Sequence, residues 1–410
     1  MAQHYNPHIV TDGLVLSLDK YDEISYPGEP TTNLISDGRW ESAAAWSSPG
    51  WGGWGNSSMI SLVTADLPND PSRGVYGGTG PVVQFGPSGW GSGVSGMQIN
   101  LNYTDQTAGT VSFWYRTLNT GSGNMWSGFY QYPGLDSRDA YISVGSTTDW
   151  AFYSTTRTWT NSSGHAYRFI TDSNSHDGTD FTWQLWGIQF EKKSHVTKFV
   201  NGSRSATDGW KDLSGNGNHA DLTSLTYSTT NIKNTPNNDF SFGGSSASDY
   251  ITCGNSIDMT SHDTTLQAWI YIETLSHTDS THSVFGGAAT SGHGYHEIRD
   301  SGSSVYKMTF WTSTDGWQYA NTGLSAQTWY HVTWVWDGLE LTWYLNGVND
   351  GSYTFTTMSP YGLGFKYIGA WNSSLREFNG KIDIATVYNR ALSSTEVLQN
   401  FNAKRSRFGV

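Results

Sequence analysis

The sequence predicts an all-β fold, and three of its features support this. Thr, Ser, Trp, Tyr and Gly dominate over the helix formers Ala, Leu, Glu and Lys, with 20 Trp, 23 Tyr and 47 Gly in 410 residues. Short runs of alternating apolar and polar residues recur, separated by turn-forming residues. Aromatic residues make up 15% of the chain, enough apolar area to order it, which excludes a disordered protein.

Length, charge and cysteine content limit the class of protein. A chain of 410 residues is too long for one ordinary core, so two or three domains are expected. The formal net charge of −13 argues against a nucleic-acid partner, which favours a basic surface. The opening MAQHYNPHIV lacks the regions of a signal peptide, and no apolar run is long enough for a membrane span. The single cysteine, Cys253, is expected to be a small buried hydrophobic side chain.

Two local elements can be assigned within the C-terminal half. The stretch HVTWVWDGLELTWYLNG predicts a β-hairpin that turns at Asp337-Gly338, followed by a second turn at Asn346-Gly347. The first turn would pair Trp336 with Leu339, Trp334 with Leu341 and Val332 with Trp343, all on one apolar face. The stretch NRALSSTEVLQNFNAK predicts a helix, in which Ser393 and Glu396 form a capping box and Leu392 and Val397 a hydrophobic staple.

Two separated stretches both look like the start of a domain. One is DGLVLSLDKYDEISYPG at residues 12–28, and the other is DGWKDLSGNGNHADL at residues 208–222. The residues between them, from NLISDGRWE to DFTWQLWGIQFEKKSHVTKFV, have a Gly- and Trp-rich texture of their own. We therefore expect one domain split by an inserted one, which is tolerated when the ends of the insert lie close together.

These stretches resemble known families. From Trp210 onward, DLSGNGNHADL, DYITCGN, TLQAWIYIE, KYIGAW and FNGKIDIATVYNRALSSTEV resemble a laminin G-like, concanavalin A-like jelly roll. The opening IVTDGLVLSLDKYDEISYPG resembles the start of such domains in tailed-phage structural proteins. The insert resembles a carbohydrate-binding-module jelly roll. The resemblance implies two β-sandwich jelly rolls, the C-terminal one discontinuous: residues 1–30 and 201–410 in one, residues 31–200 in the other.

The resemblance also implies a function. We expect a non-enzymatic virion structural or adhesion protein of a tailed phage: a capsid decoration, head fibre or tail-associated module that binds host-surface glycans. The expected partners are other virion proteins and host polysaccharide, with no nucleic acid and no membrane, and the expected assembly is a homotrimer, because repeated weak sites gain avidity. The alternatives are a free carbohydrate-binding lectin and a glycanase. Related glucanases carry an E-x-D-x-E strand, but Lys381, Asp383 and Ala385 stand in that pattern here, so both working carboxylates are missing.

The local sequence around ten of the tryptophans divides them into two groups. Five lie in alternating strand patterns and are expected in the core: Trp114, Trp183, Trp269, Trp334 and Trp343. Five lie in polar, Gly-rich contexts that indicate loops: Trp51, Trp54, Trp90, Trp126 and Trp159. Exposed tryptophans stack on sugar rings and also anchor protein interfaces, so the second group predicts a glycan site or a protein interface.

Charged residues provide two further candidate sites. The basic C-terminal residues Lys404, Arg405 and Arg407 either complement the dipole of the preceding helix or dock on an acidic partner. The single cofactor expected is a structural calcium, which would be held by Asp19, Asp22 and Asp212. In the alternative, Asp212 caps the SGNGNH turn.

The stretch SGHGYHEIRD gathers candidate metal ligands. Its spacing suggests a metal site at His293, His296, Glu297 and Asp300, for which a solvated loop beside a strand is the alternative.

Overall fold

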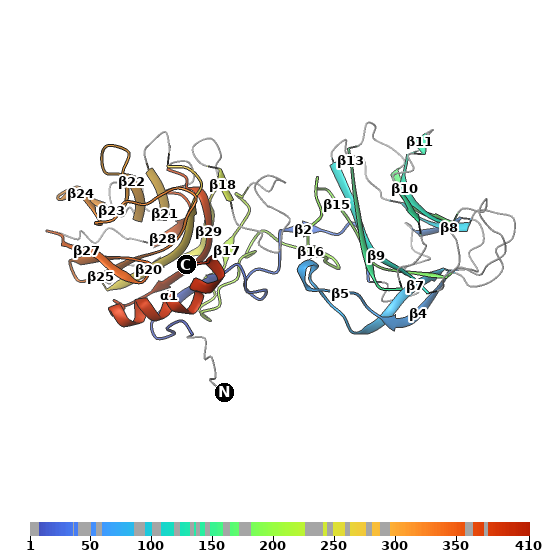
Figure 1. Ribbon diagram of the computed structural model, residues 1–410, viewed down its shortest axis with the longest axis horizontal. Coiled ribbons are helices and arrows are strands. Elements are labelled where there is room, and N and C mark those ends of the chain that lie inside the picture. Colours follow the sequence, from blue (N-terminus) through green and yellow to red (C-terminus); the bar gives the residue numbers. More distant parts are fainter. Residues whose placement is uncertain are drawn as a thin grey trace. The chain divides into compact units, whose positions relative to one another are not determined.

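The computed structural model divides the chain into two units, unit 1 (Met1–Gly28 with Ser205–Val410) and unit 2 (Glu29–Arg204) (Figure 1). The residues that it describes are 8–35, 37–39, 51–54, 60–85, 95–100, 108–118, 124–131, 135–136, 140–143, 148–158, 165–171, 182–225, 241–243, 249–258, 263–275, 281–287, 296–356, 364–372 and 376–410. The all-β prediction is confirmed, since α1 (Ser394–Phe408) is the one α-helix among these residues. Across this described part, no helix is long and apolar enough to cross a membrane.

Unit 1 is a sandwich of two antiparallel sheets. In the described residues, the helix-side sheet has the order β1 (Leu14–Asp19), β29 (Asn379–Tyr388), β20 (Thr264–Ile272), β25 (Trp329–Asp337), β26 (Glu340–Leu345), β27 (Val348–Thr354), and β18 (Ser241–Gly243) also pairs with β29. The far sheet has the order β17 (Ala220–Asp221), β19 (Ile251–Asp258), β28 (Gly364–Ile368), β21 (Thr281–Gly287), β22 (His296–Asp300), β23 (Tyr306–Thr312), β24 (Gly316–Tyr319).

The core of unit 1 lies between these two sheets. It is made of alternate side chains from both, such as Leu16 and Trp334 from the helix-side sheet and Met308 from the far sheet. Cys253 is a free, buried thiol in this core, as expected, and burial raises its pKa. The five tryptophans expected to be buried are at most 4% exposed, which confirms that prediction for Trp114, Trp183, Trp269, Trp334 and Trp343.

The hairpin at β25 and β26 is confirmed, but its predicted register is wrong. Asp337 pairs with Glu340, so the turn residues are Gly338 and Leu339, with Gly338 at φ 59°. Glycine at the first turn position suits a type II′ turn, which competes with the type I′ turn that Asp-Gly favours. The pairs become Trp336–Leu341, Trp334–Trp343 and Val332–Leu345. Because the shift is two residues, the apolar face is unchanged.

The second predicted turn and the helix start are also confirmed. Asn346 and Gly347, at φ 51° and 79°, join β26 to β27 as a type I′ turn requires. Ser393 and Glu396 form the capping box at the start of α1. The staple residues Leu392 and Val397 are buried in one apolar cluster beneath the helix, which joins α1 to the outer face of the helix-side sheet (Figure 1).

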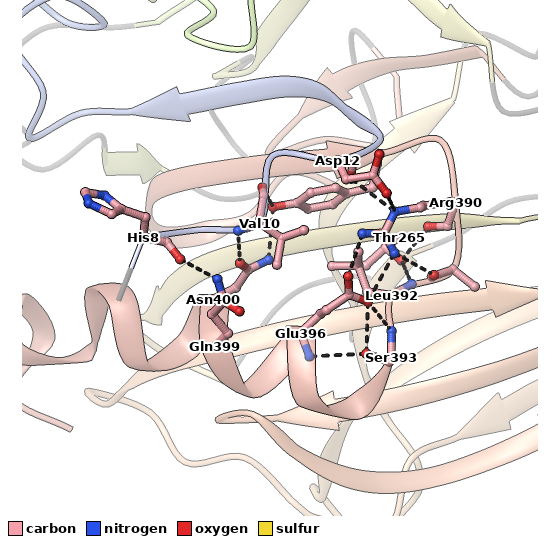
Figure 2. Close-up of polar contacts among 12 residues, drawn as sticks. His8, Val10, Asp12, Thr265, Arg390, Leu392, Ser393, Glu396, Gln399 and Asn400 are labelled. Atoms are coloured by element: carbon pink, nitrogen blue, oxygen red, sulfur yellow. Dashed lines mark hydrogen bonds and ion pairs between the residues drawn. The ribbon is translucent and has the colours of Figure 1, made fainter. Parts of the chain in front are cut away.

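The N-terminal segment lies against α1 and the end of β29 (Figure 2). The Val10 amide donates to Asn400 Oδ1 at 2.7 Å, and the Tyr388 hydroxyl donates to the Val10 carbonyl at 2.9 Å. Gln399 donates to the His8 carbonyl, and the Arg390 guanidinium contacts Asp12. Residues 8–12 are therefore bound to the end of β29, to α1 and to Arg390 between them.

Asp19, at the C-terminal end of β1, makes further contacts with α1. Its carboxylate accepts from Lys404 Nζ at 2.8 Å and from Arg407 Nη1 at 2.9 Å, and its side chain is 4% exposed. Since β1 pairs with β29 along Leu14–Asp19, both ends of this strand are tied to the C-terminal part of the chain.

Unit 2 is a second sandwich. Among the described residues, one sheet has the order β13 (Ala151–Thr158), β9 (Ala108–Thr117), β15 (Trp183–Glu191), β7 (Thr79–Phe85), β4 (Ile60–Asp66). The other has the order β11 (Leu135–Asp136), β10 (Asn124–Gln131), β14 (His165–Thr171), β8 (Ser95–Asn100), β3 (Trp51–Trp54), with β12 (Ala140–Ser143) on β10. Two small pairs, β5 (Asn69–Asp70) with β6 (Val75–Tyr76) and β2 (Thr31–Thr32) with β16 (Ser203–Arg204), and the 3-10 turn η3 (Pro71–Arg73) complete it.

The ends of unit 2 are held together. β2 and β16 pair Thr31 with Arg204, so the segments entering and leaving the unit are neighbours. Buried polar contacts surround this pair: Glu29 binds Lys193 and His195, and Glu191 accepts from Thr31 Oγ1 at 2.7 Å. Neighbouring ends are what an insertion into another domain requires.

The ion pairs of Asp19 with Lys404 and Arg407, which we call the Asp19 clamp, lead to the first prediction. Asp19→Asn should destabilise unit 1 by about 2 kcal/mol, because it leaves two cations beside a neutral amide; partial exposure of both cations reduces the cost below that of a fully buried pair. Urea denaturation followed by hydrogen–deuterium exchange of unit 1 peptides measures the change. Asp12→Asn is the matched control, because the Asp12 carboxylate is 88% exposed, and its effect should stay below about 0.5 kcal/mol. Equal effects of the two variants would contradict the clamp.

Candidate functional site

A cluster of aromatic and charged side chains lies on the outer face of the far sheet. Tyr306, Met308 and Phe310 of β23 point into the core, so the alternating residues Lys307 and Trp311 face outward. Trp311 pairs with Trp317 of β24 across a short turn, and their ring centroids lie 6.2 Å apart. We name the Trp317 cluster as Thr281, Ser283, Glu297, Arg299, Trp311, Trp317, Trp371 and Arg376.

Two guanidinium groups lie close to the Trp317 ring. The Arg299 Cζ atom lies 4.2 Å from the ring centroid of Trp317, and the Arg376 Cζ atom lies 5.8 Å from it. Arg376 also lies 5.4 Å from the ring of Trp371, and Arg299 donates to Thr281 Oγ1 at 2.6 Å. The arginine and tryptophan side chains are half-buried, so the cluster reaches the surface while its members hold one another in place.

Glu297 forms the buried base of the cluster. Its side chain is fully buried, and it accepts from Ser283 Oγ at 2.8 Å and from Arg376 Nη1 at 3.1 Å. Burial raises the pKa of the Glu297 carboxyl, against the opposing effects of Arg376 and Ser283. This arrangement fixes the Arg376 guanidinium beside both tryptophans.

Backbone geometry reinforces the position of Arg376. Its φ is 59°, in the left-handed region that a non-glycine residue seldom adopts, and its carbonyl accepts from the Ser283 amide at 3.1 Å. Strained residues of this kind concentrate at binding and catalytic sites, where the surrounding contacts maintain them.

The suggested metal site in SGHGYHEIRD has a different structure. His296 points into the core against Phe310 and Trp334 and accepts from Trp336 Nε1 at 3.4 Å, whereas Glu297 points to the opposite face. Neighbouring strand residues cannot share a face, so these two side chains do not form one ligand set. Asp300 accepts from the Gly302 amide, and His293 lies outside the described residues. In the described part of the chain, no group of three His, Cys, Asp or Glu side chains could hold a metal ion.

The glucanase pattern on β29 has no catalytic geometry either. A register irregularity between Ile384 and Ile382 interrupts the alternation at Asp383. Ala385 then packs in the core, while the Lys381 ammonium lies 4.8 Å from the ring of Tyr271. Asp383 is fully buried and is bound by Lys20 and the Tyr21 hydroxyl.

The three aspartates considered for calcium have separate partners. Asp212 caps the SGNGNH turn, accepting from the amides of Ser214 at 2.9 Å and Asn218 at 3.0 Å. Asp22 accepts from the Ile24 and Ser25 amides, which makes it a turn cap as well. Asp19 is neutralised by Lys404 and Arg407. These contacts favour structural roles for the three carboxylates, and a structural calcium stays a prediction.

The basic C-terminal residues also have intramolecular contacts. Lys404 and Arg407 bind Asp19, and the Arg405 Cζ atom lies 5.8 Å from the ring of Phe401. The sequence argument overlooked Asp19 as their partner because 385 residues separate it from Lys404. Docking of these residues on an acidic protein stays a prediction.

The predicted loop positions of the second tryptophan group are partly wrong. Trp51 and Trp54 lie in β3, paired with Ile99 and Gly96, and Trp126 lies in β10, paired with Tyr141 and Ile170. The glycines around them suggested loops, but the strong β-propensity of tryptophan prevails here. Trp90 and Trp159 lie outside the described residues. A glycan or interface role for all five stays a prediction.

The sequence argument missed the Trp317 cluster, although a local signal for part of it exists. In FWTSTDGWQY, Trp311 and Trp317 flank a short turn at positions that face each other in a hairpin. Arg299, Trp371 and Arg376 come from distant segments that only the strand order of the far sheet brings together.

Comparison with known proteins places this cluster within a recognised domain. Residues 242–398 match the family model described as the concanavalin A-like lectin/glucanases superfamily, so unit 1 contains a concanavalin A-like domain. Similar solved structures include domain 4 of AbnA, an extracellular arabinanase of Geobacillus stearothermophilus, in complex with arabinotriose (20% identity, 48% of this chain and 95% of that chain, TM-score 0.34). The receptor binding domain of botulinum neurotoxin type G is another (16% identity, 49% of this chain and 50% of that chain, TM-score 0.34). A native heptameric SAP-like pentraxin of Limulus polyphemus is a third (16% identity, 38% of this chain and 78% of that chain, TM-score 0.31). No curated protein matches the sequence.

The buried histidine at the back of the cluster predicts a pH dependence. Burial lowers the pKa of His296 from 6.5 to about 3. The unfolded chain therefore takes up this proton at higher pH than the folded chain, and stability is lost as pH falls from about 6.5 towards 3. Between pH 7 and pH 5 the contribution of His296 should be about 2 kcal/mol.

Replacing the ring tests this prediction. His296→Phe should make the stability of unit 1 less dependent on pH by that amount, measured by urea denaturation with hydrogen–deuterium exchange at pH 7 and pH 5. His219, which is half-buried and accepts from the Asp212 amide, offers the control variant His219→Gln. An unchanged pH dependence in His296→Phe would refute the assignment.

Proposed function

We propose that this chain is a non-enzymatic carbohydrate-binding protein and that the Trp317 cluster of unit 1 is its binding site. The observation that carries the proposal is Trp317 itself, which is half-buried on the outer face of the far sheet and has Arg299 and Arg376 near its ring. Tryptophan rings stack on sugar rings, while guanidinium groups hydrogen-bond to their oxygens. The match of residues 242–398 to a superfamily of lectins and glucanases adds support.

Binding without hydrolysis is the chemistry that we propose. Most glycoside hydrolases use two carboxyl groups, about 5 to 9.5 Å apart, on either side of the scissile bond. The Trp317 cluster, as defined by its contacts, contains one carboxylate, Glu297, which is fully buried beneath Arg376. Asp383 on β29 is equally buried and bound to Lys20. These features favour a lectin over a glycanase.

The setting that we propose is the particle of a tailed phage, in which the protein serves as a capsid decoration, head fibre or tail-associated module. Support comes from the resemblance of residues 9–28 to the opening of phage structural proteins. Recognition of host-surface glycans and a homotrimeric assembly belong to the same proposal. Mass spectrometry of purified phage particles tests it, since absence of the protein from particles would favour a free lectin.

The proposed site makes a direct prediction. Trp317→Ala should weaken binding to a glycan identified on a polysaccharide array by about tenfold or more, because it removes the stacking surface. Isothermal titration with the purified chain measures the affinity. The same polysaccharides should release no reducing sugar during prolonged incubation with the chain.

Two variants in unit 2 make the test specific. Trp150→Ala removes a half-buried tryptophan that donates to the Asp66 carbonyl, and it should leave binding unchanged. Trp126→Ala tests the alternative site expected in the inserted domain. Loss of binding in Trp126→Ala with normal binding in Trp317→Ala would move the site to unit 2 and refute the proposal.

A further inference from the structure

The Trp317 cluster concentrates positive charge in an acidic protein. The whole chain carries 22 basic and 35 acidic residues. In the cluster, the Cζ atoms of Arg299 and Arg376 lie 4.2 Å and 5.8 Å from the ring centroid of Trp317. Lys307 pairs with Arg299 in the register of β22 and β23, so its side chain stands beside Arg299 on the same outer face. Two guanidinium groups therefore lie near the Trp317 ring, and a third cation, Lys307, lies beside Arg299.

The carboxylate of the cluster does not offset this charge at the surface. Glu297 is fully buried and is bound by Ser283 and Arg376. Its effect is to position Arg376, because a buried acid must be paired to be tolerated. A ligand at the surface would meet guanidinium groups before it met this acid.

Arg299 has the geometry of an oxyanion receptor. In the described part of the chain, its guanidinium donates one hydrogen bond, from Nη1 to Thr281, lies over the Trp317 ring and interacts electrostatically with the buried Glu297. A guanidinium group carries five N–H donors in one plane, a geometry that matches two oxygens of a carboxylate or similar anion. Stacking on Trp317 holds that plane in a fixed orientation, which lowers the entropy cost of binding.

We propose that the glycan bound by the Trp317 cluster is anionic, with a sugar ring against Trp317 and an oxyanion substituent, a carboxylate or a sulfate ester, on Arg299 and Lys307. This inference rests on the proposed function and narrows its ligand class. A neutral glycan would hydrogen-bond to these cations through its hydroxyl groups but would leave their positive charge unbalanced.

Matched polymers test the charge requirement on the full chain. Polygalacturonate is compared with its fully methyl-esterified form, and carrageenan with agarose, by isothermal titration at two salt concentrations. At least one charged polymer should bind ten or more times tighter than its neutral partner, and its affinity should fall with added salt. The two pairs distinguish carboxylate from sulfate.

Substitutions locate the charge effect. Arg299→Gln should reduce affinity for the charged polymer about tenfold without changing that for the neutral one, and Arg299→Lys should restore only part of it, because the planar donor pair is lost. Lys381→Gln is the matched control, since it removes a cation on the helix-side sheet and should have no effect. Hydrogen–deuterium exchange of β22 and β23 verifies that each variant is folded.

The possible failures are distinguishable. If neutral polymers bind as tightly as charged ones and binding depends on Trp317, the anionic ligand is refuted while the carbohydrate site stands. Equal affinity of Arg299→Gln and the unaltered chain for the charged polymer also refutes it. If no polymer of either kind binds, the proposed function fails with it.

Discussion

The pairing of β1 with β29 joins residues 14–19 to residues 384–388, and the organisation of unit 1 depends on it. Closing a loop of this length costs entropy, although the cost grows only slowly with length. The pairing is stabilised by burial of Leu16 and Leu18 in the core, each contributing about 2 kcal/mol. The Asp19 clamp and the contacts of Val10 with Asn400 and Tyr388 add polar stabilisation at both ends of the strand.

The same connection determines which face of unit 1 carries the proposed site. α1 covers the outer face of the helix-side sheet, where Trp269 stacks on Phe408 with ring centroids 4.1 Å apart. On the outer face of the far sheet, Trp311 and Trp317 are instead half-buried, and Arg299 and Arg376 lie near the Trp317 ring. The C-terminal helix therefore covers the tryptophan of one face, whereas the tryptophans of the other face remain half-buried, and we propose this second face as the ligand-binding face.

Sequence reasoning succeeded where local chemistry decides the structure. Turn glycines, strand alternation and the capping box of α1 follow from neighbouring residues, so the β25–β26 faces and the helix start could be predicted. The hairpin register could not, because Asp337-Gly338 and Gly338-Leu339 are both acceptable turns and tertiary packing chooses between them. Lys404 and Arg407 were assigned without Asp19, and Glu297 without Arg376, because these partners are distant in sequence and meet only in the folded chain. His296 and Glu297 could have been separated beforehand, since adjacent strand residues face opposite ways.

Unit 1 is one compact unit whose chain is interrupted by unit 2, and we propose that it folds and binds glycan by itself. The β2–β16 pair keeps the ends of the insert adjacent, and within unit 1 the Lys211 amide donates to the Ser25 carbonyl at 2.7 Å, so the two host segments also meet at the junction. The most direct measurement replaces residues 29–204 with a short glycine-serine linker and records hydrogen–deuterium exchange together with glycan affinity. The account predicts protected β1 and β29 amides and an affinity within about twofold of the full chain, a difference of about 0.4 kcal/mol. Unprotected β1 amides, or loss of binding in a folded protein, would contradict it.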